Sequence, residues 1–274
     1  MKLICMAILS GLIMMTPVFA GGQGSSGSAA GTSYTIEAGG STSVTPLMER
    51  MAEEYRKLRP NIKININGTG SGDGINNAGI LYQIGMSSRE LTAVELGRGL
   101  TAETIAIDGI AVIVHNSNPV TNLTLDQIRD IFTGAVTDWS QVTGGAKSGR
   151  IAVVSREEGS GTRSAFEELA GFQGRLVSGA NESTSTGAIM SGISTNPDAI
   201  GYISLGSVNS TVKAVSVNSA EASKANVLNG SYRIARPFII LYGGNVHSET
   251  RAFIDWMLSP AGQDIAGTSW IRVN

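Results

Sequence analysis

Arginine, serine and threonine side chains gather in one short stretch of the sequence, Arg156-Glu-Glu-Gly-Ser-Gly-Thr162. This stretch follows an apolar run at 151–154, typical of a buried strand, and precedes 163–169, typical of the first turns of a helix. Ser160 or Thr162 can cap that helix, and the glycines permit a turn that points backbone N–H groups to one side. Free N–H groups, hydroxyls and a guanidinium at one point predict a site for a small anion.

Two other segments, 39–43 and 68–74, are also rich in glycine, serine and threonine. Each follows a strand pattern, and 39–43 precedes a helix pattern that spans 47–58. One such segment alone is more typical of an ordinary turn. Because loops at the carboxyl ends of strands meet at one crevice in an open α/β sheet, three of them predict a shared site.

Strand patterns alternate with helix patterns through the rest of the chain. Strands are expected at 110–114, 200–203 and 237–242, and helices at 125–132, 188–193 and 250–258. Thr124 with Gln127 predicts a capping box at the start of one of these helices. The alternation predicts an α/β architecture.

The composition limits the classes of function. With 274 residues, 42% of them hydrophobic and 15% charged, the chain is long enough for two lobes and too polar for a membrane protein. Its formal charge of −2 gives no basic field for nucleic acid or an anionic membrane. Local groups must therefore hold any anion.

The first residues are typical of a secretory signal peptide at 1–20. Lys2 precedes an apolar run that is shorter than the roughly 20 residues of a membrane span, and Ala20 is small enough for a cleavage site. Cys5 precedes most of that run, so a lipid anchor is not expected and a periplasmic location is. The Gly/Ser-rich segment 21–33 is expected to be a flexible linker.

An enzyme is an alternative that the motifs do not support. Ser160 lies in Gly-Ser-Gly, but Glu158 takes the place of the first glycine of a nucleophile elbow. His115 and His247 lie in no catalytic motif, and no His/Asp/Glu cluster has metal-ligand spacing. We expect no catalysis, no cofactor and no metal.

Several segments together resemble the phosphate-binding proteins of phosphate ABC importers, which are extracytoplasmic solute-binding proteins of type II. The segments are GGSTSVTPLMERMAEEY, GTGSGDGI, IGMSSREL, DGIAVIVHNSNPV, LTLDQIRDIFTG, VVSREEGSGTRSAFEEL, AIGYISLG and RPFIILY. SREEGSGTR together with GSTS is the most specific part, and the resemblance covers 34–274.

The resemblance implies an α/β, two-lobed type II periplasmic-binding-protein fold with the ligand in the interlobe cleft. The first lobe would comprise 34–112 plus 236–274, and the second 113–235. A monomeric receptor would bind inorganic phosphate, close by a hinge and present it to the membrane permease of the importer. A receptor for sulfate or molybdate, a secreted phosphatase and a secreted adhesion or signalling module are the alternatives.

The resemblance also implies which residues contact the ligand: Thr42, Ser43, Ser71, Ser88, Arg156, Ser160, Gly161 and Thr162. Glu158 is expected to pair with Arg156 and orient its guanidinium. Some relatives carry an aspartate at the position of Ser88 that accepts the proton of hydrogen phosphate. Asp73 is a hypothetical substitute for that aspartate, and Arg89 either adds a second positive charge or faces solvent.

Overall fold

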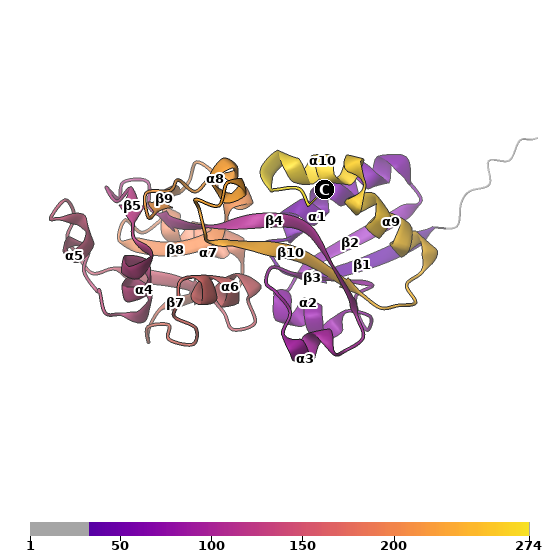
Figure 1. Ribbon diagram of the computed structural model, residues 1–274, viewed down its shortest axis with the longest axis horizontal. Helices are drawn as coiled ribbons and strands as arrows, with labels where there is room; N and C mark the ends of the chain where they lie inside the picture. The colour runs from indigo at the N-terminus through magenta and orange to yellow at the C-terminus, as the bar shows by residue number, and fades with distance from the viewer. Residues whose placement is uncertain (1–32, 274) are drawn as a thin grey trace, which may run out of the picture. The chain divides into compact units, whose positions relative to one another are not determined.

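The computed structural model describes residues 33–273 and arranges them in alternating strands and helices (Figure 1). The predicted signal peptide at 1–20, with Cys5, and the predicted linker at 21–33, except Ser33, lie outside the described residues. None of the helices within 33–273 has both the length and the apolar character that a membrane span requires.

The elements follow one another in the order that the alternation predicts, with several additions. The first part of the chain forms β1 (Tyr34–Gly40), α1 (Thr45–Leu58), β2 (Ile62–Gly68), α2 (Ser71–Asn77), β3 (Ile84–Ser87), α3 (Ala93–Leu96) and β4 (Thr101–Val114). The middle forms β5 (Asn122–Leu123), α4 (Leu125–Thr133), α5 (Ser140–Thr143), β6 (Ala152–Arg156), α6 (Gly161–Leu169), β7 (Asn181–Ser183) and α7 (Thr186–Ser194). The last part forms β8 (Ala199–Ser204), the 3-10 helix η1 (Leu205–Ser207), β9 (Lys213–Val217), α8 (Lys224–Leu228), β10 (Ala235–Tyr242), α9 (Ser248–Leu258) and α10 (Pro260–Ser269).

Local sequence explains several of these boundaries. α1 buries apolar side chains three and four residues apart, among them Leu47, Met48 and Met51, and carries a proline in its first turn. Thr124 and Gln127 form the predicted capping box of α4. Ser160 caps α6, since its hydroxyl accepts a hydrogen bond from the backbone N–H of Arg163.

The strands form one sheet in the order β2-β1-β3-β10-β4-β8-β6-β7, with β9 paired to β4 and β5 paired to β9. β1, β2 and β3 are parallel, and so are β8, β6 and β7. β10 is antiparallel to β3 and β4, and β4 is antiparallel to β8. The carboxyl ends of each parallel group therefore lie at one edge.

β4 and β10 connect the two parallel groups, as Figure 1 shows. Residues 101–109 of β4 pair with β10, and residues 110–114 pair with β8 and β9. The predicted strand at 110–114 is thus the second part of a longer strand. We call the group around β1, β2, β3 and β10 the first lobe, and the group around β6, β7, β8 and β9 the second lobe.

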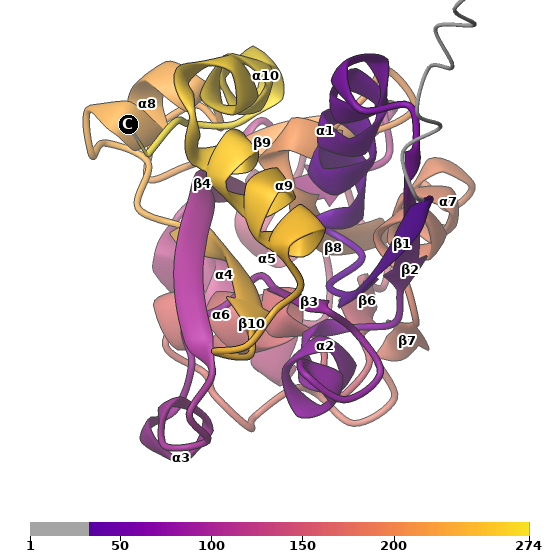
Figure 2. The same cartoon turned by 90° about the vertical axis from the view of Figure 1, so that its right-hand side faces the viewer.

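Each lobe buries its own core on both faces of its strands. In β10, Phe238 and Ile240 pack with α1, α9 and α10, whereas Ile239 and Leu241 pack with α2. Figure 2 shows α1, α9 and α10 gathered on one side of these strands and α2 on the other. In β4, Ile110, Val112 and Val114 enter one core of the second lobe, and the residues between them enter another.

Candidate anion-binding site

The three parallel strands of the first lobe each deliver hydroxyl groups just beyond their carboxyl ends. Ser41, Thr42 and Ser43 follow β1, Ser71 opens α2 after β2, and Ser88 follows β3. The strand register aligns Gly40 with both Gly68 and Met86, so the loops that follow lie side by side. The first two glycine-rich segments therefore lie next to each other, as expected for loops at the carboxyl ends of neighbouring parallel strands.

The first-lobe hydroxyls are buried and hydrogen-bonded to one another. Ser41 Oγ donates to Ser88 Oγ at 2.8 Å, and Ser71 Oγ lies 3.3 Å from Ser88 Oγ. The backbone N–H of Ser88 donates to Ser71 Oγ at 3.1 Å. All three residues are at most 2% exposed, so their hydroxyls are preorganised away from bulk water.

The second lobe adds hydroxyls from the starts of two of its helices. Thr162 lies in the first turn of α6, and its Oγ1 is 2.8 Å from Ser43 Oγ. Thr186 opens α7, and its Oγ1 is 3.2 Å from Ser43 Oγ and 3.3 Å from Thr42 Oγ1. These seven residues are called the hydroxyl cluster: Ser41, Thr42, Ser43, Ser71, Ser88, Thr162 and Thr186.

Glycines let the third glycine-rich segment approach the cluster closely. A Cβ on Gly161 would lie 2.3 Å from Ser71 Oγ and 2.9 Å from Ser88 Oγ, so any larger residue would force these side chains or the loop to move. The N–H of Gly72 donates to the carbonyl of Gly159 at 2.9 Å, and Gly159 has a φ of +82°. The segment 159–162 therefore packs directly against the first lobe.

Arg156, at the end of β6, is the guanidinium that the motif predicts, and it is 2% exposed. Its Nε and Nη2 donate to the carboxylate of Glu157 at 2.8 Å and 2.7 Å. Nε also donates to the carbonyl of Ser183 at 3.2 Å. The expected pairing of Arg156 with Glu158 is wrong, because the preceding residue Glu157 turns toward the guanidinium and Glu158 is exposed.

Three helices begin at the cluster and add their N-terminal partial charge. α1, α6 and α7 start within a few residues of Ser43, Thr162 and Thr186 respectively. Backbone N–H groups of a first helical turn have no partner inside the helix and favour a negative charge. Buried hydroxyls, helix N-termini and a guanidinium together suit a small oxyanion.

The structure does not bring every predicted residue into the cluster. Ser160 Oγ accepts from the N–H of Arg163 at 3.3 Å and so caps its own helix. The Asp73 carboxylate accepts hydrogen bonds from Thr69, Asn77 and Tyr82, which lower its pKa, the bond from Thr69 most. None of these donors belongs to the hydroxyl cluster.

Arg89 makes an ion pair away from the cluster. Its Nη1 and Nη2 donate to both carboxylate oxygens of Glu95 at 2.8 Å and 2.7 Å. This bidentate pair engages the guanidinium of Arg89, which therefore contacts Glu95 and no residue of the hydroxyl cluster.

Sequence reasoning missed Ser41 and Thr186 as members of the cluster. Ser41 stands in the GSTS segment that the motif already contained, so the signal was present. Thr186 closes a polar stretch without periodicity, and only its position before a helix pattern could have suggested it. Arg236, within the RPFIILY segment, is a third residue near the cluster that the sequence did not single out.

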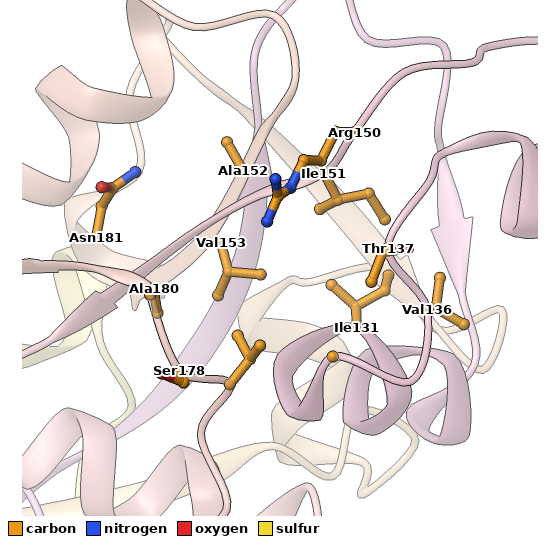
Figure 3. Close-up of a pocket in the computed structure, with 13 residues that line it drawn as sticks. Ile131, Val136, Thr137, Arg150, Ile151, Ala152, Val153, Ser178, Ala180 and Asn181 are labelled. Atoms are coloured by element: carbon orange, nitrogen blue, oxygen red, sulfur yellow. The ribbon is translucent and has the colours of Figure 1, made fainter.

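A separate cavity of about 260 Å³ lies in the second lobe beside α4 and β6 (Figure 3). Ile131, Val136, Ile151 and Val153 give it apolar walls, with Arg150 at its side. No residue of the hydroxyl cluster lines this cavity, so the two features are distinct. Within 33–273, no three His, Cys, Asp or Glu residues are grouped so that they could hold a metal ion.

Comparisons with known proteins agree on one family. A family model described as a PBP superfamily domain matches residues 25–261. The phosphate-binding protein PstS of Borreliella burgdorferi is 30% identical over 245 residues, which are 84% of this chain and 86% of that protein.

Solved structures give the same result. A candidate phosphate ABC transporter substrate-binding protein of Clostridium perfringens, with bound phosphate, is 45% identical with a TM-score of 0.84. That match covers 88% of this chain and 100% of the other. An ABC-type phosphate transport receptor of Vibrio cholerae is 36% identical with a TM-score of 0.70, and the match covers 86% and 99% of the two chains. The chain therefore belongs to the PBP superfamily and, within it, to the family of the PstS phosphate-binding proteins.

Proposed function

We propose that this protein is an extracytoplasmic receptor that binds inorganic phosphate between its lobes and delivers it to the permease of an ABC importer. The observation that carries the proposal is the hydroxyl cluster, in which serines and threonines of both lobes, most of them buried, meet at helix N-termini, with Arg156 at the end of β6, the strand that precedes α6. The relatives named above are phosphate-binding proteins, and they favour neither sulfate and molybdate receptors nor phosphatases.

The chemistry of the cluster matches the ligand. Phosphate presents oxygens that accept hydrogen bonds in a tetrahedral arrangement, and serine and threonine hydroxyls rotate to donate to them. Nε and Nη2 of Arg156 bind Glu157, and we assign Nη1 of Arg156 to the anion. We assign the backbone N–H groups of Gly161 and Thr162 to it as well, because they open α6.

Transport requires the lobes to part and close, and the two connecting strands are the hinge that we propose. The first lobe would comprise 34–112 and 236–274, and the second 113–235. Ligand residues come from both lobes, so closure assembles the complete site within one chain and a monomer suffices.

We also propose that the protein is not an enzyme. Catalysis by Ser160 would need a base that takes its hydroxyl proton, and the hydrogen bond found at this hydroxyl comes from the backbone N–H of Arg163 and supplies no such base. His115 bonds to Ser117, and His247 caps α9, so neither imidazole contacts the hydroxyl cluster. Within 33–273 neither histidine is therefore placed to act as a base for Ser160.

Calorimetric titration of the ligand-stripped mature protein with phosphate, sulfate and molybdate at two pH values tests the function. Tight binding of phosphate with negligible binding of sulfate is the expected result. Comparable affinities would contradict phosphate as the specific ligand and leave a receptor for tetrahedral oxyanions. Absence of binding to all three would leave only the fold.

A further inference from the structure

A buried ion pair joins the two connecting strands directly behind the hydroxyl cluster. Asp108 of β4 and Arg236 of β10 face each other in the strand register, and Nη2 of Arg236 donates to Oδ2 of Asp108 at 3.2 Å. Both side chains are at most 2% exposed. Replacing such a pair by packed apolar residues often costs no stability, because removing two charges from water is expensive. Stability alone therefore does not explain this pair.

Arg236 reaches the anion site through Ser88. Its Nη1 donates to the backbone carbonyl of Ser88 at 3.0 Å, and the hydroxyl of the same residue bonds to Ser41 and Ser71. Nε of Arg236 is buried and has no hydrogen-bond partner among residues 33–273. The guanidinium of Arg236 thus holds Ser88 in position, and its Nε–H group has no acceptor among the described residues.

Asp108 links the pair to the second lobe. Its Oδ1 accepts from Ser204 Oγ at 2.8 Å and from the backbone N–H of Gly206 at 3.4 Å. Ser204 ends β8 and Gly206 lies within η1, so one carboxylate contacts the hinge strands and the second lobe together. Any change of charge on Asp108 acts at the point where the lobes connect.

Burial disfavours the charged form of both partners. It raises the pKa of Asp108 to about 6, against the opposing effect of Arg236. It lowers the pKa of Arg236 to about 10, and the positive charge of Arg156 contributes to that lowering. The guanidinium groups of Arg156 and Arg236 therefore repel each other, and a bound anion would reduce this repulsion.

Each buried guanidinium has its own carboxylate: Glu157 for Arg156, and Asp108 for Arg236. We propose that Arg236 is a positioning residue of the anion site that holds Ser88 in place and adds a second positive charge, and that Asp108 sets how much of this charge the anion feels. The inference rests on the proposed phosphate function. Ionised Asp108 lowers the positive potential that Arg236 creates at the anion site. Protonated Asp108 no longer lowers it.

The decisive variant is Asp108→Asn, which keeps the shape of the side chain and removes its charge. The measurement is the ratio of phosphate dissociation constants, wild type over variant, by calorimetry between about pH 5 and pH 8. Taking a ratio cancels the titration of phosphate itself. We expect the variant to bind roughly three- to ten-fold more tightly at the upper pH, since a like charge is gone.

The ratio should fall toward one at the lower pH, because the wild-type carboxylate becomes protonated as the pH drops through about 6. The other ionisable groups around the pair do not titrate in this range. They are Arg236, with a pKa of about 10, and the buried tyrosines Tyr202 and Tyr232, whose pKa values are raised by burial.

Glu249→Gln is the matched control, since it removes the carboxylate that accepts hydrogen bonds from Nη2 of Arg59 and changes the net charge by the same amount as Asp108→Asn. For this control, the ratio of the phosphate dissociation constants, wild type over variant, should stay near one at every pH. If Asp108→Asn behaves like this control, the inference is overturned. If the wild-type protein itself does not bind phosphate, the proposed function fails instead, and the two outcomes are distinct.

Arg236 is tested by two substitutions. Arg236→Met should weaken phosphate binding roughly ten-fold or more, through loss of both the charge and the bond to Ser88. Arg236→Lys should recover part of this affinity, because it restores the charge but cannot span Asp108 and the Ser88 carbonyl. A folded Arg236→Lys or Arg236→Met variant with wild-type affinity would contradict the role.

Discussion

Ser43 Oγ, which follows β1 in the first lobe, lies 2.8 Å from Thr162 Oγ1 at the start of α6 in the second lobe. The two residues are separated by 119 positions, and both are at most 1% exposed. Their contact exists only while the lobes touch. Substitutions along this boundary should therefore change ligand affinity more than they change the stability of either lobe.

Thr186→Val removes a hydroxyl that contacts Thr42 and Ser43 and keeps the shape of the side chain. We expect phosphate affinity to fall roughly two- to ten-fold, the range of one neutral hydrogen bond. Thr195→Val is the control, because it removes an exposed hydroxyl at the other end of α7. Equal affinities of the two variants in calorimetry would exclude Thr186 from the site.

Gly161→Ala should impair closure of the lobes. Its Cβ would lie 2.3 Å from Ser71 Oγ, so we expect phosphate affinity to fall about ten- to a hundred-fold. Gly187→Ala, in α7, meets nothing within 4 Å and should bind phosphate normally. Calorimetry gives the affinities and thermal unfolding the stabilities. Unchanged affinity of Gly161→Ala would show that this approach is not needed for binding.

Arg156→Ala should abolish tight phosphate binding, with a loss of about a hundred-fold or more, because a buried charged donor is removed. Arg89→Ala breaks a similar bidentate pair with Glu95 and should leave affinity unchanged, since Arg89 contacts no member of the hydroxyl cluster. Micromolar or tighter binding by Arg156→Ala would refute the ligand arrangement proposed above.

Asp73→Asn should not alter the preference for phosphate over sulfate. The three bonds that Asp73 accepts use both carboxylate oxygens on donors outside the hydroxyl cluster, and they hold its pKa below the usual range. The ratio of the phosphate and sulfate dissociation constants, compared with wild type, is the measurement. A ratio that shifts toward sulfate would restore Asp73 as the group that reads the phosphate proton.

Glu95→Gln should destabilise the protein only above acidic pH. Arg89 holds the pKa of Glu95 at about 2, below the ordinary value of 4.5, so the ion pair stabilises the fold above pH 4.5. This stabilisation is lost as the pH falls toward 2. Near neutral pH we expect the substitution to lower the free energy of unfolding by about 1 kcal/mol, which corresponds to a fall of roughly 2–4 °C in the melting temperature.

Thermal unfolding of Glu95→Gln at several pH values checks this. Glutamine preserves the capping bond to the N–H of Thr92, so the comparison isolates the charge. Glu90→Gln removes the same charge from an exposed neighbour and should show no such dependence. A difference that persists near pH 2 would assign the effect to packing.

The fold class and most long elements follow from periodicity, but α2 does not. Its sequence SGDGINN contains two glycines and two asparagines, which are poor helix formers, so local propensity predicts a loop. Tertiary contact decides instead: a Cβ on Gly74 would lie 2.6 Å from the Met86 carbonyl and 2.7 Å from Gly40 Cα. No local pattern encodes such an approach.

The sequence predicts the kind of chemistry at the site better than it predicts which side chains pair with one another there. Motif and strand context singled out the segments that contain Arg156, Ser43 and Thr162, and the family resemblance supplied the expected contacts of these residues. Glu157 and Glu158 are neighbours of the same chemistry, so the spacing of residues cannot decide which carboxylate faces the guanidinium of Arg156; the backbone conformation after β6 decides it. The pairing of Asp108 with Arg236 depends on strand register between distant segments, which a single sequence does not reveal.

The route of β10 also dictates an order of assembly. The second-lobe core draws on residues between Ile110 and Ile234, whereas the first-lobe core needs Phe238, Phe253 and Trp270 near the end of the chain. During synthesis the second lobe can therefore complete its core while the first lobe still lacks a strand and two helices. A nascent chain thus has an unfinished amino-terminal half until its last residues appear.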